Sequence, residues 1–255
     1  MPISQHRHVL EAPEAPAAYA ANRVAPAARG RAGRSAATRA TALAVISGDD
    51  VYEDLFTAAS AMQSALTEEG FATRTSLGTA PLDGAADADV IVLYTALGRF
   101  TTEQRERLAA AVRGGCGLVA LHSTTVLASP PDQLDEADRL LAELIGSRYV
   151  SHGPPPHESR FEVRLDPDHE VTAGIASFEV THEHYRLATA SDVRVVGWRD
   201  TESGTEPLVH VRQYGDGRVC YLQLGHDLRI WGEPAMRLLV RRAARWACRP
   251  DHEGA

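Results

Sequence analysis

Histidines are concentrated between residues 122 and 226, where many follow an apolar segment or stand beside glycine or proline. Eight of the eleven histidines share this region: His122, His152, His157, His169, His182, His184, His210 and His226. Imidazole exchanges protons near neutral pH and binds divalent metals. Clustered histidines therefore indicate acid–base chemistry or a metal site. The spacings match no compact zinc motif of the HExxH type.

Some of these histidines have plainer interpretations. For His157, His169 and His210 we expect structural roles, because an isolated histidine is most often a surface or hydrogen-bonded residue. His182 and His184 stand two residues apart, which places them on one face of a strand. That pair could be two ligands, or it could be a solvent-exposed strand edge.

The segment GLVALHST (117–124) ends an apolar run in polar groups: His122, Ser123 and Thr124. Its apolar residues predict a buried strand, and open parallel sheets bind ligands outside the carboxyl ends of their strands. His226 follows a second apolar segment, in LGHD, so we expect His122 and His226 to converge from two loops. Ser123 could act as a nucleophile beside a base. A hydrogen-bonding or helix-capping hydroxyl is the plainer reading, because the segment has no GxSxG elbow.

The elements that must position these residues alternate between strand and helix in the first half. Apolar segments at 43–46, 71–76, 89–96 and 117–121 predict strands. A helix with Leu55 and Leu66 on one face follows the first strand, a capping box formed by Thr101 and Gln104 begins another, and a third is expected at about 134–144. This order predicts an α/β fold with a doubly wound, mostly parallel sheet.

The second half has a different pattern. The segments at 159–165 and 191–198 alternate between apolar and polar residues, as half-exposed strands do. Residues 208–225 read as a hairpin around Gly215-Asp216-Gly217, and a final helix has Pro234 in its first turn. We expect these strands to add antiparallel members to the same sheet.

Composition excludes several functions. The 255-residue chain carries a formal net charge of −8 and has a pI of about 5.8, which disfavours binding to nucleic acid or to an anionic membrane. No apolar stretch reaches the ~20 residues of a membrane-spanning helix, and we expect no secretory signal, because the first residues form no continuous apolar segment. The three cysteines form no CxxC pair, so a cytoplasmic location is expected.

Three regions are predicted along the chain. Residues 1–40 are rich in alanine, proline and arginine and poor in large apolar side chains, so we expect a flexible extension. Residues 41–250 are expected to form one α/β domain, and residues 251–255 a short tail.

Four segments taken in order resemble the ThuA-like family, which is named for trehalose utilisation. They are GLVALHST, ELIGSRYVSHGPP, FEVRLDPDHEVTAGIASFEVTHEHYR and VRQYGDGRVCYLQLGHDLRIWGEPAMRLLVRRAARWA. The resemblance implies a bacterial protein with the fold of class I glutamine amidotransferases, a flavodoxin-like sheet with helices on both faces. It does not imply an amidotransferase, because His122 and Ser123 stand where the amidotransferase cysteine would be.

The resemblance also implies site residues. The histidine after the central strand falls on His122 and that of a Gly-His-Pro loop on His152. The Asp-Glu-Leu-Tyr motif falls on residues 182–185, which places its glutamate at Glu183 and its tyrosine at Tyr185.

Two further loops complete the implied site. The Gly-His-Asp loop falls on Gly225, His226 and Asp227. The first loop differs, since many relatives have a histidine where this chain has GDDVYEDL, and it offers Asp49 and Tyr52 instead.

The family's links to sugar metabolism imply an enzyme acting on a keto-sugar or sugar-derived metabolite, as an isomerase, epimerase or lyase. We assign catalysis to His122, Glu183 and His226. We assign substrate binding to a larger set: Ser123, Thr124, His152, Tyr185, Asp227, Asp49 and Tyr52. The alternatives are a non-catalytic carbohydrate-binding module and a divergent hydrolase that uses Ser123.

The expected cofactor and partners follow from the same resemblance. A divalent metal, Zn²⁺ or Mn²⁺, held by His122, His152 and His226 would polarise a carbonyl oxygen. The expected partners are a small sugar, a sugar oxidoreductase that makes the keto-sugar, and a second copy of the chain in a homo-oligomer.

Overall fold

The computed structural model describes residues 39–48, 54–95, 100–130, 132–153 and 155–248. The predicted site residues Asp49 and Tyr52 lie outside these ranges, as do the tail at 251–255 and nearly all of the predicted extension. No helix in the described ranges combines the length and apolar character that a membrane crossing requires.

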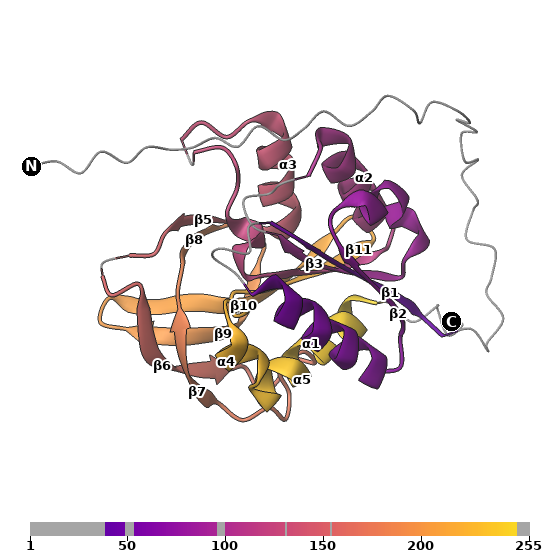
Figure 1. Cartoon of the computed structure of the whole chain (residues 1–255). Helices are drawn as coiled ribbons and strands as arrows, with labels where there is room; N and C mark the ends of the chain where they lie inside the picture. The colour runs from indigo at the N-terminus through magenta and orange to yellow at the C-terminus, as the bar shows by residue number, and fades with distance from the viewer. Residues whose placement is uncertain (1–38, 49–53, 96–99, 131, 154, 249–255) are drawn as a thin grey trace, which may run out of the picture. The chain divides into compact units, whose positions relative to one another are not determined.

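Nine strands of the described chain form one mixed sheet (Figure 1). In spatial order they are β2 (Ala72–Leu77), β1 (Thr41–Ser47), β3 (Val90–Thr95), β4 (Gly117–Leu121), β11 (Gly217–Leu222), β10 (Gly204–Tyr214), β9 (Arg194–Thr201), β6 (Glu158–Leu165) and β7 (Phe178–Glu183). Neighbours are parallel from β2 to β11 and antiparallel from β11 to β7. The order of the parallel half is that of flavodoxin-like sheets. The predicted fold class is therefore confirmed.

The hairpin of β10 and β11 connects the two halves. It turns at Gly215 and Asp216, as the sequence predicts, and returns β11 alongside β4 with Leu222 opposite Leu121. Because β4 and β11 are parallel and end at the same level, the residues that follow them lie at one edge of the sheet. This register brings the loop after β11 beside His122.

Helices cover both faces of the parallel half. The helices α1 (Leu55–Glu68), α4 (Leu228–Trp231) and α5 (Pro234–Ala247) pack on one face, and α2 (Thr102–Arg113) and α3 (Glu136–Ile145) pack on the other. In β3, Val92 and Tyr94 belong to the first core, and Ile91 and Leu93 to the second. Burial on both faces explains why this strand is apolar without alternation.

Helix starts follow local capping. The predicted capping box of α2 is present, with Thr101 and Gln104 each bonding the other's backbone. The helix predicted at 134–144 begins instead at Glu136, because the Asp135 side chain accepts a hydrogen bond from the Asp138 N–H at 2.7 Å.

A second, two-stranded sheet pairs β5 (Ser147–Ser151), which directly follows α3 in the chain, with β8 (Arg186–Thr189).

Candidate active site

His122 occupies a strained position at the carboxyl end of β4. Its φ is +42°, which non-glycine residues seldom adopt, and it begins a short 3₁₀ helix. The ring is fully buried, and Nδ1 lies 2.7 Å from the backbone oxygen of Gln223. Since a carbonyl only accepts, Nδ1 carries a proton and Nε2 is the atom directed to the cluster. Gly225 packs against this residue: its φ is +148°, and a Cβ there would lie 3.1 Å from Cβ of His122.

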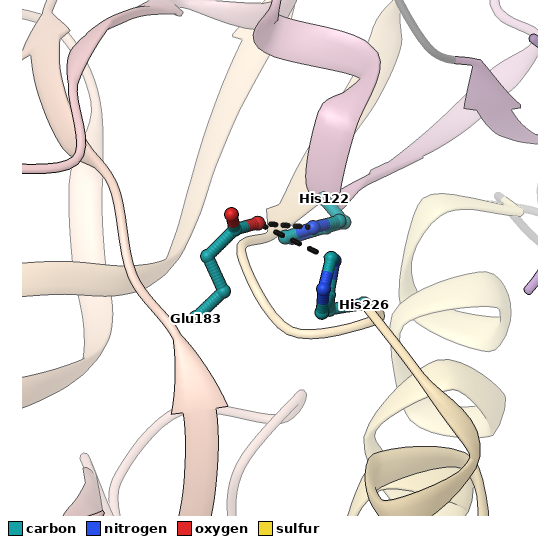
Figure 2. Close-up of side chains that lie close together, drawn as sticks. All are labelled: His122, Glu183 and His226. Carbon is teal, nitrogen blue, oxygen red and sulfur yellow. Dashed lines mark ion pairs between the residues drawn. The ribbon is translucent and has the colours of Figure 1, made fainter. Parts of the chain in front are cut away.

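Glu183, the last residue of β7, gathers three imidazoles. Its Oε2 lies 3.2 Å from Nε2 of His122 and 3.4 Å from Nδ1 of His226, and its Oε1 lies 2.8 Å from Nε2 of His152. Figure 2 shows the first two contacts, with the side chains arriving from β4, β7 and the loop after β11. The structure thus brings together four of the predicted site residues.

The electrostatics of Glu183 favour its ionised form. Burial raises the pKa of this carboxyl, but the hydrogen bond and charge of His122 and the charges of His226 and His152 outweigh burial and lower the pKa to about 2. An ionised carboxylate oxygen can accept a hydrogen bond from an imidazole N–H or share a metal ion with an imidazole. The cluster therefore offers a negative group to a proton or a cation.

Two tyrosines extend the cluster. The Tyr185 hydroxyl lies 2.9 Å from Nε2 of His122, and the two rings stack with centroids 4.7 Å apart. The Tyr149 hydroxyl lies 2.6 Å from Nδ1 of His152. Burial and the negative charge of Glu183 raise the pKa of Tyr149, so its hydroxyl remains protonated at neutral pH.

His182 supports the cluster from behind. It is fully buried, and its Nε2 accepts hydrogen bonds from the backbone N–H groups of Gly225 and His226, each at 3.1 Å. Burial and the charge of His122 lower its pKa to about 3. His184 is also buried, so the interpretation of this pair as a solvent-exposed strand edge is wrong.

Two of the predicted substrate-binding residues make structural contacts. The Thr124 hydroxyl donates to the Leu93 carbonyl at 3.0 Å and accepts from the Thr95 N–H at 3.1 Å. The Asp227 carboxylate accepts the Arg229 N–H at 2.9 Å as the N-cap of α4, and it also pairs with the Arg229 side chain. The side chains of both residues form hydrogen bonds within the fold at this edge of the sheet.

Ser123 is 2 % exposed. Its Oγ has no hydrogen-bond partner among the described residues. A serine nucleophile needs a neighbouring base within hydrogen-bond reach, and the described contacts provide none.

Three residues could hold a metal ion: His122, Glu183 and His226, with one ligand atom from each and all such atoms within 4.8 Å of one another. Separations of 3.2 and 3.4 Å fit two ligands of one ion at about 2.0–2.2 Å. The bond from His122 to Gln223 is the outer contact that ligating histidines typically make. The third ligand of this group is Glu183 and not the predicted His152. His152 instead contacts Oε1, the other carboxylate oxygen of Glu183.

Sequence reasoning missed two supporting residues, Tyr149 and Gln223, and it considered His182 only as one of a possible pair of ligands. Gln223 is a fully buried amide whose Nε2 donates to the backbone oxygens of Tyr185 and Pro207, while its Oε1 accepts the Tyr185 N–H. Two sequence signals were available. Gln223 is a polar residue at the end of an apolar segment, and His182 directly precedes Glu183.

These features define a flavodoxin-like α/β protein with a histidine–glutamate cluster at the carboxyl edge of its sheet. A family model described as ThuA, trehalose utilisation, matches residues 43–247, and the chain belongs to this family. The resemblance read from the sequence is thereby confirmed. No curated protein matches the chain.

Solved structures share the fold at low sequence identity. A ThuA-like protein from Parabacteroides merdae superposes with a TM-score of 0.64 at 16% identity, covering 82% of this chain and 90% of its own. A cytoplasmic protein from Salmonella typhimurium gives 0.60 at 14% identity, covering 82% and 100%. A β-galactosidase from Rahnella sp. R3 gives 0.56 at 13% identity, covering 82% of this chain but 30% of the galactosidase.

Proposed function

We propose that the protein is an enzyme of sugar metabolism that moves a proton next to the carbonyl of a keto-sugar, as an isomerase, epimerase or lyase. The observation that carries this proposal is a single carboxylate contacting imidazoles from three separate segments. The family description, trehalose utilisation, points to a role in sugar utilisation and supports a sugar as the ligand.

The exposure of each group suggests its role. The side chains of His152 and His226 are 30% and 25% exposed, whereas His122 is fully buried. We therefore assign proton exchange with the substrate to His226, as the sequence suggested, and to His152 in place of the buried His122. The ionised Glu183 stabilises the protonated form of either imidazole and orients it, and His122 holds Glu183 in place.

The reaction needs a base and then an acid. A neutral imidazole removes the proton from the carbon α to the carbonyl, which leaves an enolate and an imidazolium. The imidazolium then returns the proton to the enolate, to a neighbouring carbon or to a leaving oxygen. Hydroxyl or imidazolium donors near the carbonyl oxygen stabilise the enolate, and the cluster supplies such donors.

The cluster also fits a divalent cation. His122, Glu183 and His226 would hold Zn²⁺ or Mn²⁺ and leave positions open. A bound ion would polarise the carbonyl oxygen of the substrate. In that case His152 stays free of the ion and acts as the proton-transfer group.

Two alternatives stay open to experiment. A carbohydrate-binding module would bind keto-sugars without turning them over. A hydrolase would use Ser123, but its buried hydroxyl without a described partner disfavours that assignment.

A partner oxidoreductase that supplies the keto-sugar and a homo-oligomer belong to this proposal as well. A cytoplasmic location agrees with the names of the Salmonella neighbours.

The test is turnover of a panel of keto-sugars, followed by NMR, with binding measured in parallel by calorimetry. The proposal expects new sugar signals with at least one keto-sugar and none with the matching reduced sugars. Binding without turnover across the panel would favour the module instead.

A further inference from the structure

The loop that carries His226 is held from two sides. On one side, the Gly225 carbonyl accepts hydrogen bonds from the Tyr94 hydroxyl at 3.2 Å and from Nε1 of Trp231 at 2.8 Å. On the other side, Nε2 of His182 accepts from the N–H groups of Gly225 and His226, each at 3.1 Å. The orientation of this peptide unit is therefore set by three aromatic side chains.

The contacts of His182 also determine where its proton is. Nε2 receives two N–H donors, so it offers a lone pair and carries no hydrogen. Nδ1 contacts the backbone oxygen of Glu183, so it must donate. His182 therefore sits in the cluster as a neutral imidazole and contributes no charge.

These bonds join the two halves of the candidate site. His182 lies on β7 next to Glu183 and donates to the backbone of that residue, and it accepts from the backbone of His226. Without the Nε2 acceptor of His182, the N–H groups of Gly225 and His226 would lose this hydrogen-bond partner. Because unsatisfied buried donors are costly, we expect the loop to rearrange locally.

We propose that His182 is a positioning residue, which fixes the backbone of Gly225 and His226 so that the His226 imidazole stays in contact with the Glu183 carboxylate. This proposal rests on the proposed function for its effect on rate, although the structural role is measurable without any substrate.

Two variants distinguish the hydrogen-bond acceptor of His182 from the bulk of its side chain. His182→Leu removes the acceptor and keeps an apolar side chain of similar bulk. His182→Gln keeps an oxygen that reaches the position of Nε2. His210→Gln is the matched control, since His210 is equally buried but contacts the backbone oxygen of Ile145 instead.

The first readout is hydrogen–deuterium exchange of peptides that contain residues 225 and 226. We expect exchange at these amides to speed up by roughly tenfold or more in His182→Leu. In His182→Gln the rate should lie close to that of the wild type, and in His210→Gln it should equal the wild-type rate. Unchanged exchange in the folded His182→Leu variant would overturn the proposal, whether or not a substrate is found. If His182→Leu does not fold, His182→Ala takes its place as the variant without the acceptor, and unchanged exchange there overturns the proposal in the same way.

The second readout is the rate on the keto-sugar that the wild type turns over. We expect kcat to fall by roughly tenfold or more in His182→Leu with KM nearly unchanged, and the glutamine to restore much of it. Faster exchange with an unchanged kcat would overturn the catalytic part of the proposal. A wild type without any turnover contradicts the proposed function alone.

Discussion

Nε2 of His122 lies 3.2 Å from Oε2 of Glu183, although β4 and β7 are at distant places in the sheet. The two residues meet because β4 ends at a strained, buried turn and β7 ends where the loop after β11 crosses the edge. The same Nε2 atom also faces the Tyr185 hydroxyl at 2.9 Å, so a carboxylate and a hydroxyl meet one buried imidazole nitrogen.

Replacing Glu183 with glutamine removes the charge and keeps the shape. We expect kcat on the active keto-sugar to fall by about 10²- to 10⁴-fold, because the imidazoles lose the group that stabilises their protonated forms. The matched control is Glu179→Gln on the same strand, where the carboxylate is exposed and pairs with Arg160. Equal activity in the two variants would contradict the role of Glu183.

Replacing Tyr185 with phenylalanine removes the hydroxyl that contacts His122 and keeps the stacked ring. We expect the free energy of unfolding to fall by about 1 kcal/mol, as for other single hydrogen bonds, and kcat to fall by roughly tenfold. Tyr214→Phe is the control, because its hydroxyl accepts a 2.6 Å bond from Arg113 away from the cluster. The control should lose similar stability and keep its kcat, and a parallel loss of kcat in both variants would count against the assignment.

Several parts of this site could be predicted from the sequence, and the reasons are physical. Strand ends of a parallel sheet converge, so His122 and His226 could be placed on one edge from apolar runs alone. Glu183 is the last residue of the antiparallel strand β7, and only the family resemblance pointed to it. The roles of His182 and Gln223 depend on backbone groups distant in sequence, which no local pattern encodes. Thr124 and Asp227 were predicted to bind substrate, yet their hydrogen bonds go to the fold itself.

Acid conditions should destabilise the protein through His210. Burial lowers the pKa of this histidine to about 4, so the folded state resists the proton that the unfolded state takes up near pH 6.5. Stability is therefore present above pH 6.5 and is lost as the pH falls toward 4. We expect the wild type to lose roughly 2 kcal/mol more than His210→Gln between pH 7.5 and pH 5. Urea unfolding at several pH values measures this difference, and identical pH profiles would refute it.

Added Zn²⁺ or Mn²⁺ should bind one ion per chain at His122, Glu183 and His226. Calorimetry with the metal-free protein, purified without a histidine tag, measures the affinity. We expect Glu183→Gln to weaken it by at least about tenfold, because a charged ligand is lost, and His157→Gln to leave it unchanged. Undiminished binding in Glu183→Gln would place the ion elsewhere.

Elemental analysis of the protein as purified then shows whether the site works with an ion. If the metal is substoichiometric and a chelator changes neither activity nor Tm, the cluster acts by proton transfer alone.

The most direct test of the account is solvent deuterium incorporation into a keto-sugar, followed by NMR in D₂O. We predict that the wild type labels a carbon next to the carbonyl, that labelling falls by about 10²-fold or more in Glu183→Gln, and that Glu179→Gln matches the wild type. Tight binding of keto-sugars with no deuterium incorporated and no product formed, in the wild type as in Glu183→Gln, would contradict it.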